Sequence, residues 1–149
     1  MIRPFDDDYF MKKALEEASF AMEKGEVPVG AVIVMNDQII ARGHNLTEQL
    51  NDVTAHAEMQ AFTAASSFLG GKYLQECVLY VTLEPCQMCA GASYWAQIGK
   101  IVFGATDKER GFTKLNTKLH PKTKIISGVR EEECAQLLMD FFLSKRNKN

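Results

Sequence analysis

The pattern of apolar and polar positions predicts a chain that mixes helices with strands. Four segments are predicted to be helices: 8–24, 55–68, 86–97 and 130–145. Apolar residues recur at helical spacing in the first and last of them, and segment 86–97 is rich in small residues. Continuous apolar runs rich in strand-forming residues make up five further segments: 28–35, 38–43, 77–82, 100–105 and 124–127. Thr54 precedes the second helical segment and is expected to cap it. A hairpin followed by alternating helices and strands predicts a three-layer α/β/α sandwich around a five-stranded mixed sheet.

Length and composition add one constraint each. The chain has 149 residues, of which 46% are hydrophobic and 24% charged, so we expect one globular domain over residues 1–149. No apolar run is long enough to span a membrane. The first eight residues become acidic where a secretion signal would become apolar. A cytoplasmic location is therefore expected.

The charges are unevenly distributed along the chain. The formal net charge of −2 argues against generic nucleic-acid binding, and no DNA partner is expected. Basic residues nevertheless gather in one region and in the tail, at Lys100, Lys108, Arg110, Lys114, Lys118, Lys122, Lys124, Lys145, Arg146 and Lys148. Two interpretations stay open, a local basic surface that contacts RNA and a set of ordinary solvated side chains.

A histidine and two cysteines have the spacing of metal ligands. Cys86 and Cys89 are three residues apart, so a single helical turn can direct both sulfurs at one ion. His56 supplies a third ligand, and three protein ligands leave the fourth position of a tetrahedral zinc open, which is typical of catalytic sites. A Cys-x-x-Cys pair alone also occurs in structural zinc sites and redox pairs. Cys77 and Cys134 lie on apolar faces and are expected in the core.

Glu58 is the candidate base. It follows His56 by two residues, so a regular helix directs the two side chains differently and Glu58 need not be a ligand. It can lie beside the open position and take a proton from a bound water, whose pKa zinc lowers to about 7. Once protonated, the same carboxyl can donate to a substrate.

Taken together, His-x-Glu and Pro-Cys-x-x-Cys form the pattern of zinc-dependent nucleobase deaminases. The sequence is similar to the cytidine deaminase-like superfamily and, more narrowly, resembles the bacterial tRNA-specific adenosine deaminases. The resemblance covers nearly the whole chain and is carried by residues 26–32, 41–45, 54–58, 79–86, 88–92, 102–105 and 140–142.

This resemblance implies a reaction. One zinc ion per subunit would be held by His56, Cys86 and Cys89. The zinc-bound hydroxide would attack C6 of a flipped-out adenine, while Glu58 passes protons to the ring and to the departing ammonia. The substrate would be the wobble adenosine of a tRNA anticodon loop, the product inosine, and two identical subunits would form the RNA-binding groove.

The resemblance also implies five substrate-binding residues, namely Val29, Asn45, Ala57, Asp107 and Phe142. Val29 would form a pocket wall, Asn45 would hydrogen-bond the base, and the backbone N–H of Ala57 would face the zinc-bound oxygen. Asp107 and Phe142 would meet the anticodon loop. Read from the residues alone, Asn45 and Asp107 also suit plain turns. Phe141 and Phe142 have core spacing, so at least one of them is expected to be buried.

Two alternatives remain open. Many family members have a histidine and an arginine where this chain reads Tyr94-Trp95-Ala96, a sequence reminiscent of guanine deaminases. Residues 111–122 also look shorter than in well-known members. A deaminase of guanine or of another free purine or nucleoside is therefore the second hypothesis. A zinc-stabilised RNA-binding or assembly protein that has lost catalysis is the third, and Glu58 argues against it because a structural site has no use for that carboxylate.

Overall fold

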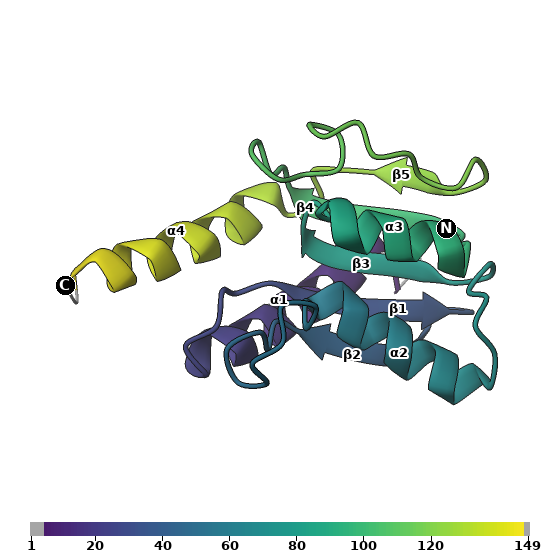
Figure 1. Cartoon of the computed structure of the whole chain (residues 1–149), viewed down its shortest axis with the longest axis horizontal. Helices are drawn as coiled ribbons and strands as arrows, with labels where there is room; N and C mark the ends of the chain where they lie inside the picture. The colour runs from purple at the N-terminus through teal and green to yellow at the C-terminus, as the bar shows by residue number, and fades with distance from the viewer. Residues whose placement is uncertain (1–4, 148–149) are drawn as a thin grey trace.

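The computed structural model describes residues 5–147, so residues 1–4 and 148–149, with Lys148 of the basic tail, lie outside it. A central sheet carries helices on both faces (Figure 1). In chain order the elements are α1 (Asp7–Glu23), β1 (Gly30–Met35), β2 (Gln38–His44), α2 (Ala57–Leu69), β3 (Val78–Leu83), α3 (Gln87–Ala96), β4 (Lys100–Ala105), β5 (Lys124–Ile126) and α4 (Glu131–Asn147). None of the helices within residues 5–147 combines the length and the apolar character needed to cross a membrane.

The five strands form one mixed sheet in the order β2-β1-β3-β4-β5. Strand β1 pairs antiparallel with β2 and with β3, whereas β3, β4 and β5 pair in parallel. This arrangement confirms the predicted three-layer sandwich with a five-stranded mixed sheet. Residues 107–122 contain turns and one isolated bridge between Gly111 and Cys86.

Alternation along the strands divides the core into two layers. Side chains facing α2 and α3 include Ile33, Leu79, Val81, Ile101 and Phe103. Their strand neighbours Val32, Val34, Tyr80 and Val102 face α1 and the start of α4. Both faces of the central strands are therefore buried, which explains why the sequence shows continuous apolar runs there.

Strand directions bring several loops to one edge of the sheet. Because β2 and β3 are both antiparallel to β1, the C-terminal ends of β2, β3 and β4 meet at the same edge. Helices α2 and α3 begin at that edge, and α4 extends away from the body of the molecule beside it (Figure 1). Ligands of open α/β sheets commonly bind at such an edge.

The start of α2 differs from the prediction. The helix begins at Ala57 and its N-cap is His56, not Thr54. Thr54 instead donates from its N–H and its hydroxyl to Asp52 Oδ1, at 2.8 and 2.7 Å. The nearby carboxylate of Asp52 closes a separate turn and so removes Thr54 from capping. The His56 side chain makes no capping hydrogen bond and is available for ligation.

Helix α4 also covers less than its periodicity predicted. Of its apolar side chains only Cys134 and Phe141 are buried, whereas Phe142 is 46% exposed. This confirms that at least one of the two phenylalanines belongs to the core. Cys77 and Cys134 are each only 1% exposed, as expected of core cysteines.

Gly30 lets α1 pack directly on β1, and its replacement should destabilise the fold. A Cβ at this position would lie 2.1 Å from the backbone oxygen of Ala14, which a helix cannot move aside cheaply. We expect Gly30→Ala to lower the free energy of unfolding by about 1–3 kcal/mol or more, measured by thermal denaturation. Gly71→Ala is the matched control, because nothing lies within 4 Å of its added Cβ. Equal melting temperatures for the two variants would contradict this packing.

Candidate metal centre and adjoining pocket

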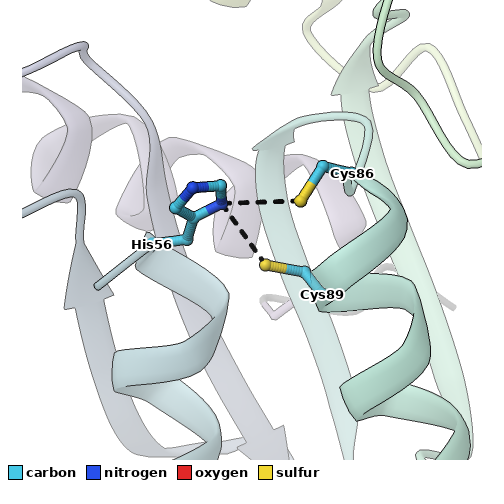
Figure 2. Close-up of side chains that lie close together, drawn as sticks. All are labelled: His56, Cys86 and Cys89. Carbon is cyan, nitrogen blue, oxygen red and sulfur yellow. Dashed lines mark hydrogen bonds between the residues drawn. The ribbon is translucent and has the colours of Figure 1, made fainter. Parts of the chain in front are cut away.

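Three side chains from two helix N-termini converge at the edge of the sheet. His56 is the N-cap of α2, Cys86 is the N-cap of α3, and Cys89 lies in the first turn of α3. The His56 Nδ1 atom lies 3.5 Å from Cys86 Sγ and 3.6 Å from Cys89 Sγ (Figure 2). All three ligand atoms lie within 4.8 Å of one another, so the cluster could hold a metal ion. Within residues 5–147, no further His, Cys, Asp or Glu belongs to this group.

The two thiols differ in how readily they lose a proton. The hydrogen bond that Cys86 accepts from Cys89, together with its contact with His56, lowers the pKa of Cys86 to about 4 although burial acts in the opposite direction. The same contact and its burial raise the pKa of Cys89 well above that of a free thiol. The hydrogen bond with Cys86 also raises the pKa of His56. The pair thus carries one negative charge readily, and a cation between the sulfurs would be needed to stabilise the second thiolate.

Glu58 lies in the first turn of α2 and is only 4% exposed. Burial raises the pKa of its carboxyl to about 7, although its contacts with backbone N–H, His56 and Cys89 act in the opposite direction. A carboxyl with a pKa near neutrality can both accept and release a proton, which is what a general acid–base requires.

A pocket of about 800 Å³ adjoins the cluster. Its lining includes His56, Glu58 and Cys86 from the cluster. It also includes every predicted substrate-binding residue, namely Val29, Asn45, Ala57, Asp107 and Phe142. The structure therefore brings the predicted residues together at one cavity, and their individual roles in binding stay predictions.

The predicted substrate-binding residues differ in their exposure and in the contacts that they make. Asn45 is 8% exposed and directly follows β2, and Ala57 opens α2, where backbone N–H groups have no intrahelical partner. Asp107 Oδ1 accepts from the N–H groups of Glu109 and Arg110 at 3.1 and 3.0 Å, so this residue does build a turn. The half-exposed ring of Phe142 approaches from α4 and stacks edge-on against the buried Phe141.

Other pocket residues were not among the five predicted substrate-binding residues. They are Val27, Thr47, Leu83, Glu84, Thr106, Lys108, Glu109, Arg110 and Leu138. Of the basic residues between Lys100 and Lys124, only Lys108 and Arg110 line the pocket, and both are exposed. Glu84 is 3% exposed, and its sequence position could have indicated a functional role, because a carboxylate there directly follows an apolar strand. Tyr94 and Trp95 do not line the pocket, and Trp95 is 78% exposed.

Comparisons with known proteins agree with this geometry. A family model for MafB19-like deaminases matches residues 5–146. A tRNA-specific adenosine deaminase of Bacillus subtilis is 47% identical over 148 residues, which cover 95% of this chain and 92% of the relative. One of Aquifex aeolicus is 46% identical, over 94% of this chain and 96% of the relative. The chain belongs to the tRNA-specific adenosine deaminase family.

Solved structures place this family member among hydrolytic deaminases. A tRNA:A34 deaminase studied for A-to-I editing at the wobble position superposes with a TM-score of 0.82 at 43% identity, over 87% of this chain and 99% of that one. A guanine deaminase of Bacillus subtilis superposes with a TM-score of 0.65 at 38% identity, over 74% and 68%. The expected superfamily and the expected enzyme class, a hydrolytic deaminase, are both confirmed.

Proposed function

We propose that this chain hydrolyses the 6-amino group of adenosine at the wobble position of a tRNA anticodon and so forms inosine. The observation that carries this proposal is the match, over more than nine tenths of both chains, to tRNA-specific adenosine deaminases at 46–47% identity. The placement of Glu58 and of the His56, Cys86 and Cys89 cluster on one pocket supports it.

Zinc is the ion that we propose for the cluster. Tetrahedral zinc holds sulfur at about 2.3 Å and nitrogen at about 2.0 Å, which separates two such ligand atoms by about 3.5 Å. The observed separations of His56 Nδ1 from the two sulfurs are 3.5 and 3.6 Å. One nitrogen and two sulfurs also suit this borderline-soft ion better than they suit magnesium or calcium.

The surrounding residues would then divide the work of the reaction. A zinc ion in this position supplies a Lewis acid that makes a coordinated water acidic near neutral pH. Glu58 takes a proton from the attacking water and gives it to N1 of the adenine. It then moves the proton of the hydroxyl now on C6 to the amino group, so that the C6–N bond breaks, the C6 carbonyl forms and ammonia leaves. The free backbone N–H of Ala57 can donate to the oxygen that develops on the base.

The pocket walls would select and hold the base. The Asn45 amide would read its polar edge, Val29 would pack on its face, and Asp107 and Phe142 would contact the flanking nucleotides. Exposed Lys108 and Arg110 add positive charge near the phosphates. Single-stranded loops are recognised by this combination of aromatic stacking, hydrogen bonds to base edges and basic groups.

Asn45→Ala should weaken recognition of the base. Because one hydrogen bond to the substrate is lost in a buried site, we expect kcat/KM on an anticodon hairpin to fall about 10- to 100-fold. Inosine formation under single-turnover conditions measures the loss, and zinc content by mass spectrometry should stay at the wild-type level. Asn45→Asp keeps the size but removes the amide donor, and it should lose as much if that donor is used. Unchanged kcat/KM in both variants would remove Asn45 from recognition.

Two further properties belong to this proposal. We propose a homodimer with one zinc ion per subunit, acting in the cytoplasm. The exposed Trp95 on the small-residue helix α3 supports a subunit contact there. Light scattering at micromolar concentration, combined with metal analysis, tests the stoichiometry, and a monomer at those concentrations would refute the dimer.

A free-base deaminase is the competing function. The guanine deaminase at 38% identity and the reminiscent Tyr94-Trp95-Ala96 sequence favour it. Two observations weigh against it. The relatives that match more than nine tenths of both chains are named as tRNA-specific adenosine deaminases. Neither Tyr94 nor Trp95 lines the pocket.

Product analysis separates the two functions. Purified protein is mixed with total tRNA, with an anticodon hairpin and with free guanine, and the products are identified by mass spectrometry. We expect inosine in the RNA, no xanthine from guanine, and a rate on the hairpin that falls steeply as salt rises, because phosphate contacts are screened. Xanthine without inosine would overturn the proposal.

A further inference from the structure

Among residues 5–147 four glutamates are buried, and two of them have no part in the proposed chemistry. Glu58 belongs to the reaction, and Glu17 contacts His44 Nδ1 at 3.0 Å. Glu26 and Glu84 are 1% and 3% exposed, and the hydrogen bonds that they receive come from backbone N–H groups. A buried carboxylate is costly unless it is well hydrogen-bonded, so the positions of these two groups call for an explanation.

Glu84 joins the end of β3 to the loop that follows β4. Its Oε1 accepts from the N–H of Asp107 at 3.1 Å and its Oε2 accepts from the N–H of Thr113 at 3.0 Å. The loop passes so close that a Cβ on Gly111 would lie 2.4 Å from the Glu84 carboxyl carbon. The proposed ligand Cys86 follows Glu84 by two residues. The same loop is also attached next to this ligand, because the N–H of Phe112 donates to the oxygen of Pro85 at 2.9 Å. One carboxylate therefore fixes the Asp107 wall of the pocket relative to α3.

Glu26 does the same on the opposite wall. Its Oε1 accepts from the N–H of Glu48 at 3.0 Å and its Oε2 accepts from the N–H of Gln49 at 2.7 Å. This loop follows β2 and carries Asn45, whose N–H donates to the oxygen of Val29 at 3.1 Å. Glu26 therefore fixes the Asn45 wall relative to the residues that lead into β1.

We infer that Glu26 and Glu84 are positioning residues, each of which holds one wall of the substrate pocket in register with the metal ligands. This inference rests on the proposed function. It adds that the two walls are set independently, since each loop is held by its own carboxylate through separate backbone N–H groups. The hydrogen bonds that the two carboxylates accept come from backbone N–H groups of the loops and not from a metal ligand. The loop that Glu84 holds also bridges Cys86 at Gly111, so zinc content has to be measured beside the kinetics.

Double-mutant cycles test this independence. Glu84→Gln and Glu26→Gln keep the shape of the side chain but leave one oxygen in place of two. Each should lower kcat/KM on the anticodon hairpin about 10- to 100-fold while zinc content stays normal. Variants on the same wall should have non-additive losses of kcat/KM, so we expect non-additivity for Glu84→Gln with Asp107→Ala and for Glu26→Gln with Asn45→Ala. Variants on different walls should have additive losses. Additive losses in all four pairs would overturn the inference.

Amide hydrogen exchange gives a readout that does not depend on activity. Glu84→Gln should speed exchange at Asp107 and Thr113 and leave Glu48 and Gln49 unchanged, and Glu26→Gln should do the opposite. Gly111→Ala perturbs the Glu84 contact from the loop side and should reproduce the Glu84→Gln pattern even if that variant folds poorly. Uniformly faster exchange across both loops would show general destabilisation and refute separate positioning. Wild-type protein that makes no inosine would instead refute the proposed function, while the exchange result stands by itself.

Discussion

Replacing Glu58 by alanine should abolish turnover while the protein stays folded and keeps its metal. The side chain is not part of the ligand cluster, yet it lies 4% exposed against the same pocket. Loss of a positioned general acid–base costs about 10²- to 10⁴-fold, so we expect kcat on the anticodon hairpin to fall by at least about 10²-fold. Single-turnover inosine formation and zinc analysis of the same preparation measure the two quantities.

Glu76→Ala is the matched control for Glu58→Ala, since Glu76 is an exposed carboxylate away from this pocket. It should leave both kcat and zinc content at wild-type values. Retained turnover in Glu58→Ala would remove this residue from the mechanism. Loss of zinc together with turnover would mean that Glu58 supports the ligands rather than the proton transfers.

Removing a ligand should affect metal content, stability and activity together. In Cys89→Ala one of the three converging donor atoms is gone, and the other two cannot complete the site. Substitution of a residue that only hydrogen-bonds a metal ligand already lowers metal affinity about 10- to 100-fold. Because Cys89 is itself a proposed ligand, we expect zinc affinity to fall by more than about 100-fold. Added zinc should raise the melting temperature of chelator-treated wild type but not that of the variant, because only the native wild-type site binds it.

Cys77→Ala provides the comparison for Cys89→Ala. Both thiols are 1% exposed, but Cys77 lies in the core cluster between α2 and the sheet. Its truncation should lower the melting temperature through lost packing and leave zinc stoichiometry intact. Full zinc retention in Cys89→Ala, or equal zinc loss in both variants, would contradict the ligand assignment.

The features that the sequence predicted well depend on local spacing. Strand β4 has the predicted bounds because its apolar run is buried on both faces. The cluster of His56, Cys86 and Cys89 was predictable because a histidine and two cysteines at this spacing have few functions other than metal binding. Thr54 was misjudged because Asp52, two residues away, competes for its hydrogen bonds. Periodicity likewise marked α4 as a helix but could not show that most of its predicted apolar face is left partly open.

Other features depend on contacts between distant segments. Glu26 meets Glu48 and Gln49, and Glu84 meets Asp107 and Thr113, across separations of 22 to 29 residues. No periodicity or motif encodes such pairings, because a carboxylate accepts equally well from any backbone N–H that the fold brings close. Asp107 differs, because its side chain accepts from backbone N–H groups only two and three residues on, and a turn was therefore already open from the sequence.

The separation between helix-borne ligands and loop-borne walls has an evolutionary consequence. In the proposed function the reacting groups lie at the starts of helices that rest on the sheet, whereas Asn45 and Asp107, two of the proposed substrate-binding residues, lie in loops that a few backbone hydrogen bonds hold. New substrates can then be acquired by remodelling those segments, without redesign of the chemistry. This modularity fits the finding that a tRNA deaminase and a guanine deaminase share the fold of this chain.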